Sequence, residues 1–118
     1  MSTPSHYRLN PEPIEVCASM PFCLGNIVKY CARAGLKGDP VADLKKAVHY
    51  LELERKRIAN AFPHGPRQMK EREEEALLLW EASDAWANGN DHERKVSQRL
   101  SRFAWALANN TTPEGLLR

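Results

Sequence analysis

Residues 22–51 read FCLGNIVKYCARAGLKGDPVADLKKAVHYL, and this stretch predicts two helices joined by a short loop. The first helix is expected over residues 21–34 and ends before Gly35, because glycine adopts the left-handed conformation of a helix C-terminus at little cost. The second helix begins after Asp39, whose side chain can cap it, and Pro40 suits its first turn. Because the loop is short, the two helices are expected to pack as antiparallel neighbours.

Helical patterns continue on both sides of this pair. A short helix is expected over residues 13–19, the second helix of the pair continues to about residue 60, and two further helices follow over 67–88 and 90–109. The sequence has no alternating apolar run and no Asn-Gly or Asp-Gly turn between two β-rich segments, so strands are not expected. The predicted fold class is all-α: a compact bundle of four to five helices.

The length of 118 residues fits a single domain. Three prolines near the N-terminus predict an extended arm, because proline fixes φ and biases its predecessor away from helix. The parts expected along the chain are the arm over 1–13, a first set of helices over 14–60, a second helical pair over 67–109 and a tail over 110–118.

Composition and charge narrow the classes of function. Hydrophobic residues make up 42% of the chain and charged residues 27%, which is ordinary for a globular protein. The net charge of +2 is too small to indicate binding of long nucleic acids. Residues 1–60 hold nine Lys or Arg and six Asp or Glu, a net charge of +3, whereas residues 61–118 hold eight and nine, so a bound anion is expected in the first half. The charged run over 71–75 is expected to form a solvated helix face.

The cysteines and the apolar segments bear on the cellular compartment. Cys17, Cys23 and Cys31 have no repeated spacing, which predicts reduced thiols among small core residues rather than a disulfide framework. No cluster of His and Cys has zinc-ligand spacing, so no metal site is expected. The sequence shows no signal-peptide pattern and no run of the ~20 apolar residues that cross a bilayer. We therefore expect a cytoplasmic protein without membrane contact.

Polar side chains share one side of the helix pair. On helices with 3.6 residues per turn, each helix presents a polar stripe beside its apolar stripe, and the two polar stripes are expected to line one groove. Together with Lys37 in the loop, the candidate ligand-binding residues on these stripes are Asn26, Lys29, Tyr30, Arg33, Asp43, Lys46 and Tyr50. His6 and Tyr7 in the N-terminal arm are expected to fold over this groove.

These residue types suit a phosphorylated ligand. The guanidinium of Arg33 offers a planar fork of donors for phosphate oxygens, and lysine gives a compact positive charge. A tyrosine ring can stack on a base, Asn26 can bind a base edge, and Asp43 can orient a cation or bind a ribose hydroxyl. The alternative is that the cations form a solvated face and the tyrosines are packing residues.

The order of these residues resembles that of a family of small tailed-phage domains described as nucleotide-kinase-like. The similarity covers residues 5–54, and only Cys31 and Ala32 replace a residue that is bulkier in the family. The family pattern runs from a His-Tyr pair through Ile-Glu-Val, Gly-Asn-x-x-Lys-Tyr-x-x-Arg and a Gly/Lys loop to Asp-Leu-Lys-Lys-Ala-x-x-Tyr-Leu. The matching residues here are His6, Tyr7, Ile14, Glu15, Val16, Gly25, Asn26, Lys29, Tyr30, Arg33, Lys37, Asp43, Leu44, Lys45, Lys46, Ala47, Tyr50 and Leu51.

The resemblance implies a phage protein that binds a phosphorylated nucleotide in the cytoplasm of the infected bacterium, with phosphoryl transfer to a nucleoside monophosphate as its activity. However, the sequence has no GxxxxGK[ST] loop to cradle phosphates, so whether the protein is an enzyme stays open. No cofactor is expected. One alternative is sequestration of a cyclic or signalling nucleotide to counter host immunity, and the other is a protein-binding helical module.

Sequestration would benefit from a homo-oligomer, because two subunits can enclose a small anion. The helices that carry Trp80, Trp86 and Trp105 are candidates for the interface between subunits. The alternative is that these tryptophans pack in the core.

Overall fold

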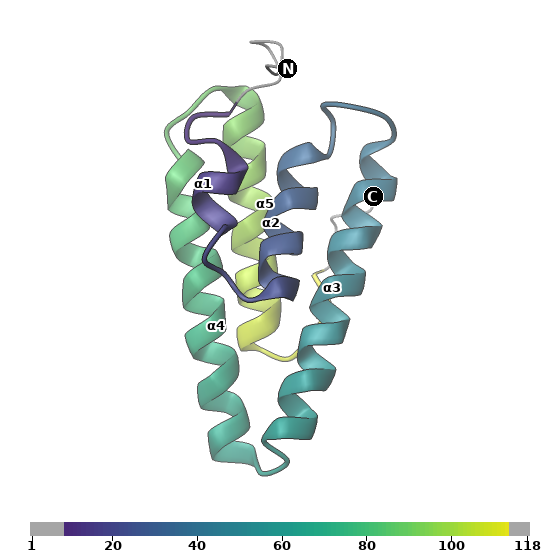
Figure 1. Ribbon diagram of the computed structural model, residues 1–118, viewed down its shortest axis with the longest axis vertical. Helices are drawn as coiled ribbons and strands as arrows, with labels where there is room; N and C mark the ends of the chain where they lie inside the picture. The colour runs from purple at the N-terminus through teal and green to yellow at the C-terminus, as the bar shows by residue number, and fades with distance from the viewer. Residues whose placement is uncertain (1–8, 114–118) are drawn as a thin grey trace.

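The computed structural model describes residues 9–113, and within that range the chain forms helices and no strands (Figure 1). The helices are α1 (Pro13–Cys17), α2 (Phe22–Arg33), α3 (Pro40–Ala61), α4 (Gly65–Trp86) and α5 (Asp91–Ala108). The all-α prediction is therefore confirmed. No helix in the described part of the chain is long and apolar enough to span a membrane.

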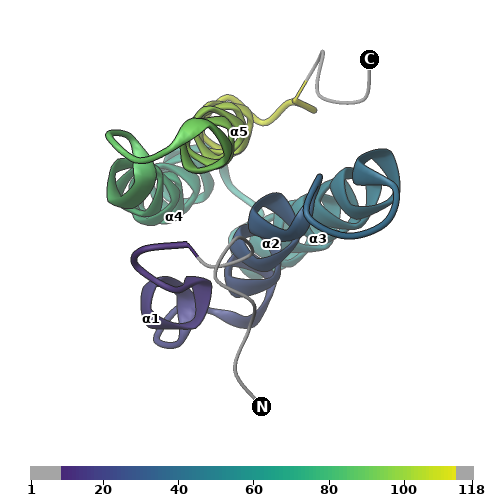
Figure 2. The ribbon, with the colours of Figure 1, turned by 90° about the horizontal axis from the view of Figure 1, so that it is seen from above.

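Two antiparallel helix pairs make up the body of the molecule. Helix α2 packs along α3, α4 packs along α5, and the short α1 lies against α2 and α4 (Figures 1 and 2). The described body is elongated, with principal extents of 47 × 27 × 26 Å. Because α3 and α4 have 22 residues each and α2 has 12, both long helices continue beyond the N-terminal end of α2 (Figure 1).

Capping groups set the helix boundaries. The Asp39 carboxylate accepts a hydrogen bond from the Val41 amide at 2.9 Å at the start of α3, as expected of an N-cap residue. Asn90 and Glu93 form a reciprocal capping box at the start of α5, where each side chain accepts from the other residue's amide at 2.9 Å. Gly35 has a φ of +91°, which confirms the predicted left-handed stop after α2.

The core lies between the two helix pairs and is closed at one end by the segment before α1. The largest fully buried side chains include Trp86, Phe103, Leu24, Ile27 and Leu51. The Trp86 indole donates a hydrogen bond to the Pro11 carbonyl at 2.8 Å, and Leu9 is buried beside this segment. Trp86 therefore packs in the core. Core packing was the alternative to an interface role that the sequence left open for the three tryptophans.

Polar contacts from α5 fasten the C-terminal end of α2. Arg99 donates to the carbonyls of Cys31 at 3.2 Å and Ala34 at 2.9 Å, and the His92 ring bonds to the Ala32 carbonyl at 2.8 Å. These carbonyls lack partners within their own helix, so α5 satisfies groups that would otherwise be unpaired. The contacts also fix the position of the loop that follows α2.

Several sequence expectations need correction. Helix α1 ends at Cys17, two residues before the expected end, and α4 begins at Gly65, two residues before the expected start. Residues 110–113 are not a free tail, because Arg55 donates to the Asn110 side chain at 3.1 Å and to its carbonyl at 2.9 Å. These hydrogen bonds explain why an arginine, Arg55, lies among the apolar residues of α3.

The charged run over 71–75 is not a uniformly solvated face. Glu75 is only 5% exposed, because the long α3 and α4 pack against each other at this level. Its burial with Glu54 creates a polar cluster between α3 and α4.

Candidate functional site

The polar stripe of α2 keeps two cations in solvent. Lys29 and Arg33 are exposed, whereas Tyr30 and Asn26 are half-buried. The Asn26 amide donates to the Phe22 carbonyl of its own helix at 2.9 Å, so one of its donors is already used. Lys37 follows in the loop and is exposed.

Aromatic rings pack at the seam between α2 and α3. The rings of Tyr30 and Tyr50 stack with centroids 6.0 Å apart and an interplanar angle of 13°, and Phe22 meets Tyr50 edge-on at 5.8 Å. The ammonium groups of Lys29 and Lys46 lie 5.2 and 5.4 Å from the centroid of the Tyr30 ring. The two tyrosines therefore already have partners within the fold, and both lysines lie near the ring of Tyr30.

Arg33 is oriented from the neighbouring helix. Its guanidinium Nε lies 3.6 Å from a carboxylate oxygen of Asp43, whose side chain is 5% exposed. The Arg33 side chain itself is 47% exposed. A buried acid thus steadies an arginine whose remaining donors face solvent, which matches the orienting role considered for Asp43.

A cavity of about 400 Å³ lies between the segment around α1 and the C-terminal half of α2. Three cations line it from α2 and the following loop: Lys29, Arg33 and Lys37. The other lining residues are mostly apolar and comprise Leu9, Glu12, Pro13, Ala32 and Leu36. We call this space the cationic cavity.

A second cavity of about 490 Å³ adjoins the first on the other side of Lys29. It lies between α1 and the N-terminal half of α2, and its lining includes Ile14, Cys17, Phe22 and Asn26. Lys29 lines both cavities and also approaches the Tyr30 ring, so it is the most central of the candidate residues.

The structure divides the candidate residues into neighbouring groups. Lys29, Arg33 and Lys37 line the cationic cavity, whereas Tyr30, Lys46 and Tyr50 meet at the α2–α3 seam. Asp43 joins the cavity group through Arg33, and Asn26 lines the second cavity. His6 and Tyr7 lie outside the described residues.

The sequence did not reveal the residues that face α2 across the cationic cavity. Leu9, Glu12 and Pro13 come from the segment before and at the start of α1, and their distance along the chain hides their proximity to Arg33 and Lys37. Only the folded arrangement of α1 against α2 brings these segments together. No helical periodicity links them.

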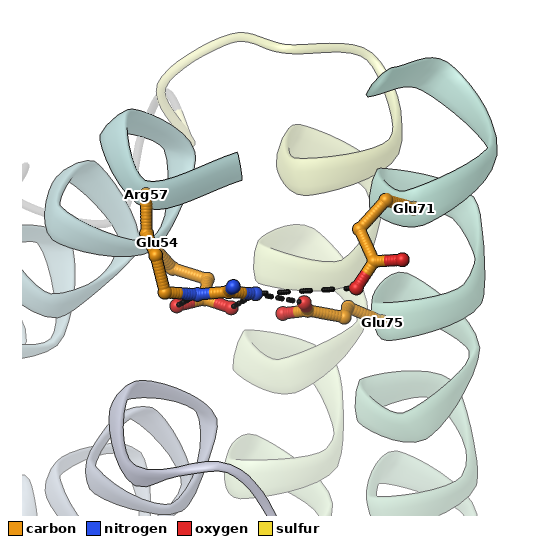
Figure 3. Close-up of polar contacts among 4 residues, drawn as sticks. All are labelled: Glu54, Arg57, Glu71 and Glu75. Atoms are coloured by element: carbon orange, nitrogen blue, oxygen red, sulfur yellow. Dashed lines mark hydrogen bonds and ion pairs between the residues drawn. The ribbon is translucent and has the colours of Figure 1, made fainter. Parts of the chain in front are cut away.

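A second polar cluster joins α3 to α4 beyond the end of α2 (Figure 3). Arg57 donates to both carboxylate oxygens of Glu54, at 2.9 and 2.7 Å, and to Glu75 at 2.7 Å. Glu71 lies 3.9 Å from the same guanidinium. The side chains of Glu54 and Glu75 are 2% and 7% exposed, so both acids are withdrawn from water.

Burial and the neighbouring Glu54 raise the pKa of Glu75 to about 9. Burial also raises the pKa of Glu54, but hydrogen bonds from Arg57 and Glu75 outweigh it and leave this pKa below its usual value. The raised pKa favours a protonated Glu75 at neutral pH, beside the Glu54 carboxylate. The signal was present in the sequence, because Glu54 falls on the apolar stripe between Leu51 and Ile58.

Among residues 9–113, no group of three His, Cys, Asp or Glu side chains is arranged to hold a metal ion. The described cysteines are free thiols, with Cys31 buried and Cys17 and Cys23 half-buried. Burial raises the pKa of Cys31 to about 12, so this thiol stays protonated. The side chains that line the cationic cavity offer three cations, the Glu12 carboxylate and apolar walls.

Comparison with known proteins adds a relationship for the first part of the chain. Residues 1–52 match a family described as a protein of unknown function, DUF3310. The Gene 1.7 protein of Enterobacteria phage T3 is 50% identical over 62 residues, which covers 42% of this chain and 38% of that protein. No solved structure matches the chain.

The matched region includes α1, α2, the loop and the first half of α3, and therefore every side chain that lines the cationic cavity. The chain is also similar to a phage protein, as the resemblance implied. The chain spans less than two-fifths of that relative's length.

Proposed function

We propose that this protein binds a phosphorylated nucleotide, with the phosphate at the cationic cavity and the sugar or base against its apolar walls. The observation that carries the proposal is the convergence of Lys29, Arg33 and Lys37 on one cavity of about 400 Å³. That volume falls within the range of roughly 300–1,000 Å³ that small-molecule sites occupy. The similarity to a phage protein suggests that binding takes place in the cytoplasm of an infected bacterium.

The cations are suited to hold a phosphate through side chains alone. Lys29, Arg33 and Lys37 succeed one another at intervals of four residues, which keeps the first two on one side of α2. Asp43 steadies the guanidinium of Arg33, so less side-chain freedom is lost when the arginine binds an anion. At the aromatic seam, Lys29 and Lys46 both lie near the Tyr30 ring.

The position of the cavity favours holding a nucleotide over transferring its phosphoryl group. The cationic cavity lies beside the C-terminal half of α2, where the helix exposes carbonyls rather than amides. The amide cradle that phosphoryl-transfer enzymes commonly use is therefore not available from this helix. One carboxylate, Glu12, lines the cavity. Sequestration is accordingly the first form of the proposal, and nucleoside-monophosphate kinase activity is the second.

Binding is tested by calorimetric titration and thermal melting with nucleoside mono-, di- and triphosphates, cyclic mono- and dinucleotides and inorganic phosphate. We expect one nucleotide class to raise the melting temperature, because a ligand at 1,000 times its Kd stabilises by about 4 kcal/mol. The double substitution Lys29→Ala and Arg33→Ala should weaken binding at least a hundredfold. Lys95→Ala, which removes an exposed cation from α5, is the matched control and should leave binding unchanged.

The proposal fails if none of the nucleotide classes shifts the melting temperature, or if the double substitution leaves the affinity unchanged. Incubation with ATP and each nucleoside monophosphate then separates the two forms. Stoichiometric binding without diphosphate formation supports sequestration. Turnover that is lost with Lys29→Ala supports the kinase.

A further inference from the structure

An exposed apolar patch lies on the half of the molecule that takes no part in the cationic cavity. It consists of Leu77 and Trp80 on α4 and Trp105 on α5, with exposed fractions of 56%, 39% and 58%. We call it the tryptophan patch. Single exposed apolar residues are common on protein surfaces, but two tryptophans and a leucine on one face indicate a binding surface.

Hydrogen bonds between α4 and α5 set the level of the three side chains along the helix pair. The Ser83 hydroxyl lies 3.0 Å from the hydroxyl of Ser97 and 2.8 Å from that of Ser101, which sets the two antiparallel helices in register. One to two turns before Ser83 on α4 are Trp80 and Leu77, and the turn after Ser101 on α5 holds Trp105. The three residues therefore lie at the same level along the helix pair.

The face that carries the patch points away from the rest of the fold. On α4 the buried side chains include Leu79 and Trp86, and on α5 they include Phe103 and Leu107, so the patch residues occupy the opposite sides of both helices. Seen from above, α1, α2 and α3 all lie on one side of the α4–α5 pair (Figure 2). No other described helix covers the outer side.

Charge on this face divides between the two helices. On the outer side of α4, the exposed Glu73 and Asp84 flank the patch, whereas on the outer side of α5 the exposed charges include Arg102 beside the patch and Arg94, which pairs with the exposed Asp91 near the start of the helix. Beside the patch the face is therefore acidic along α4 and basic along α5. Such a division can be self-complementary, provided that α4 of one copy lies over α5 of another.

We propose that the tryptophan patch pairs with the same patch on a second copy of this chain, so that two α4–α5 pairs form a four-helix bundle. A two-fold axis parallel to the helices lays α4 of each copy over α5 of the other. Trp105 then packs on Leu77 and Trp80 of the second copy. Asp84 falls at the level of Gln98 of the second copy, between the turns that hold Arg94 and Arg102.

The charges favour this arrangement over a second dimer with two-fold symmetry. A two-fold axis perpendicular to the helices, within the plane of the interface, would lay α4 on α4 and α5 on α5. With this axis at the level of the patch, Glu73 would face Asp84 of the second copy. Like charges placed opposite each other at an interface are unfavourable, so the parallel axis is the one that the sequence supports.

The size of the face is adequate for a dimer. An 18-residue helix is about 27 Å long, and two helices side by side present a face on the order of 500 Å² in projection. The accessible surface of such a face is larger, and it approaches the ~800 Å² that each partner buries in a typical stable complex. The dimer does not depend on the proposed nucleotide binding, because the patch and the cationic cavity share no residue.

The association state of the full chain tests the inference. Sedimentation equilibrium at micromolar concentration should give twice the monomer mass of 13.4 kDa. Trp105→Glu should yield a monomer with an unchanged far-ultraviolet circular dichroism spectrum. Leu53→Glu, which places the same charge at another exposed apolar side chain, on α3, should leave the dimer intact.

A charge exchange tests the orientation and guards against a simple loss of folding. Asp84→Arg and Arg102→Glu should each weaken the dimer about tenfold, and the two together should restore much of the affinity. A monomeric wild-type chain would overturn the inference, as would a dimer that survives Trp105→Glu. A wild-type chain that stays monomeric and binds a different protein through the patch would also overturn it.

Discussion

At the scale of single residues, Glu75 links the stability of the fold to pH. Its pKa of about 9 lies above the value of 4.5 expected in the unfolded chain, so the folded protein binds an extra proton between these values. The contribution of Glu75 to stability is therefore complete below about pH 4.5 and is lost as the pH rises towards 9. The lowered pKa of Glu54 acts in the acid range instead, where its contribution is lost as the pH falls.

Glu75→Gln should remove this pH dependence without breaking the cluster. The amide oxygen can accept from Arg57, as the carboxyl oxygen does, but the amide does not titrate. We expect the fall in the free energy of unfolding between pH 5 and 8 to shrink by on the order of 1–3 kcal/mol. Urea denaturation at both pH values measures it, and Glu73→Gln on the exposed side of α4 is the control. An unchanged fall would show that Glu75 is ionised in the folded protein.

Gly35 illustrates a residue whose role the sequence discloses in advance. A Cβ atom at this position would meet no heavy atom within 4 Å, so the cost of substitution comes from the φ of +91° alone. Gly35→Val should lower the free energy of unfolding by about 1–2 kcal/mol, measured by denaturation. Gly65→Ala also adds a side chain in open space but without a positive φ, and should be neutral or slightly stabilising. Equal effects of the two substitutions would contradict this account.

At the scale of the elements, the sequence predicts helix boundaries best where a capping residue marks them. The structure reproduces the helix start predicted from Asp39 and Pro40, and the start expected at residue 90 coincides with the capping box of Asn90. The contact of residues 110–113 with α3 could not be predicted, because it depends on partners distant along the chain. Glu75 was missed for the same reason, since only its burial distinguishes it from the surface acids of its helix, whereas Glu54 falls on the apolar stripe of α3.

Arg99 shows how one element depends on another. Its guanidinium donates to two carbonyls at the C-terminal end of α2, where a cation is also favoured by the helix dipole. Arg99→Met should lower the free energy of unfolding by about 1–3 kcal/mol, because hydrogen bonds from a charged group to otherwise unpaired carbonyls are lost. Lys95→Met, an exposed change one turn earlier on α5, should have little effect in the same denaturation experiment. A loss no larger than that of the control would show that α5 does not hold the end of α2.

At the scale of the whole molecule, the matched family region covers α2 and part of α3 but not the α4–α5 pair, and the two helix pairs have different proposed roles. The region similar to a phage protein family ends within α3, and it contains the whole lining of the cationic cavity. Helices α4 and α5 complete the core and present the tryptophan patch on their outer side. The sequence predicted the cations and the helix that carries them. It did not predict the facing wall at Leu9, Glu12 and Pro13, which only the packing of α1 brings into place.

The central claim is that a phosphorylated nucleotide binds at the cationic cavity. A crystal structure of the full chain with the tightest-binding nucleotide of the titration panel tests it most directly. We predict phosphate oxygens within hydrogen-bond distance of Lys29 and Arg33, with the sugar or base against Leu9 and Leu36. A nucleotide bound elsewhere, for example over the seam of Tyr30 and Tyr50, with the cationic cavity holding only water, would contradict the account.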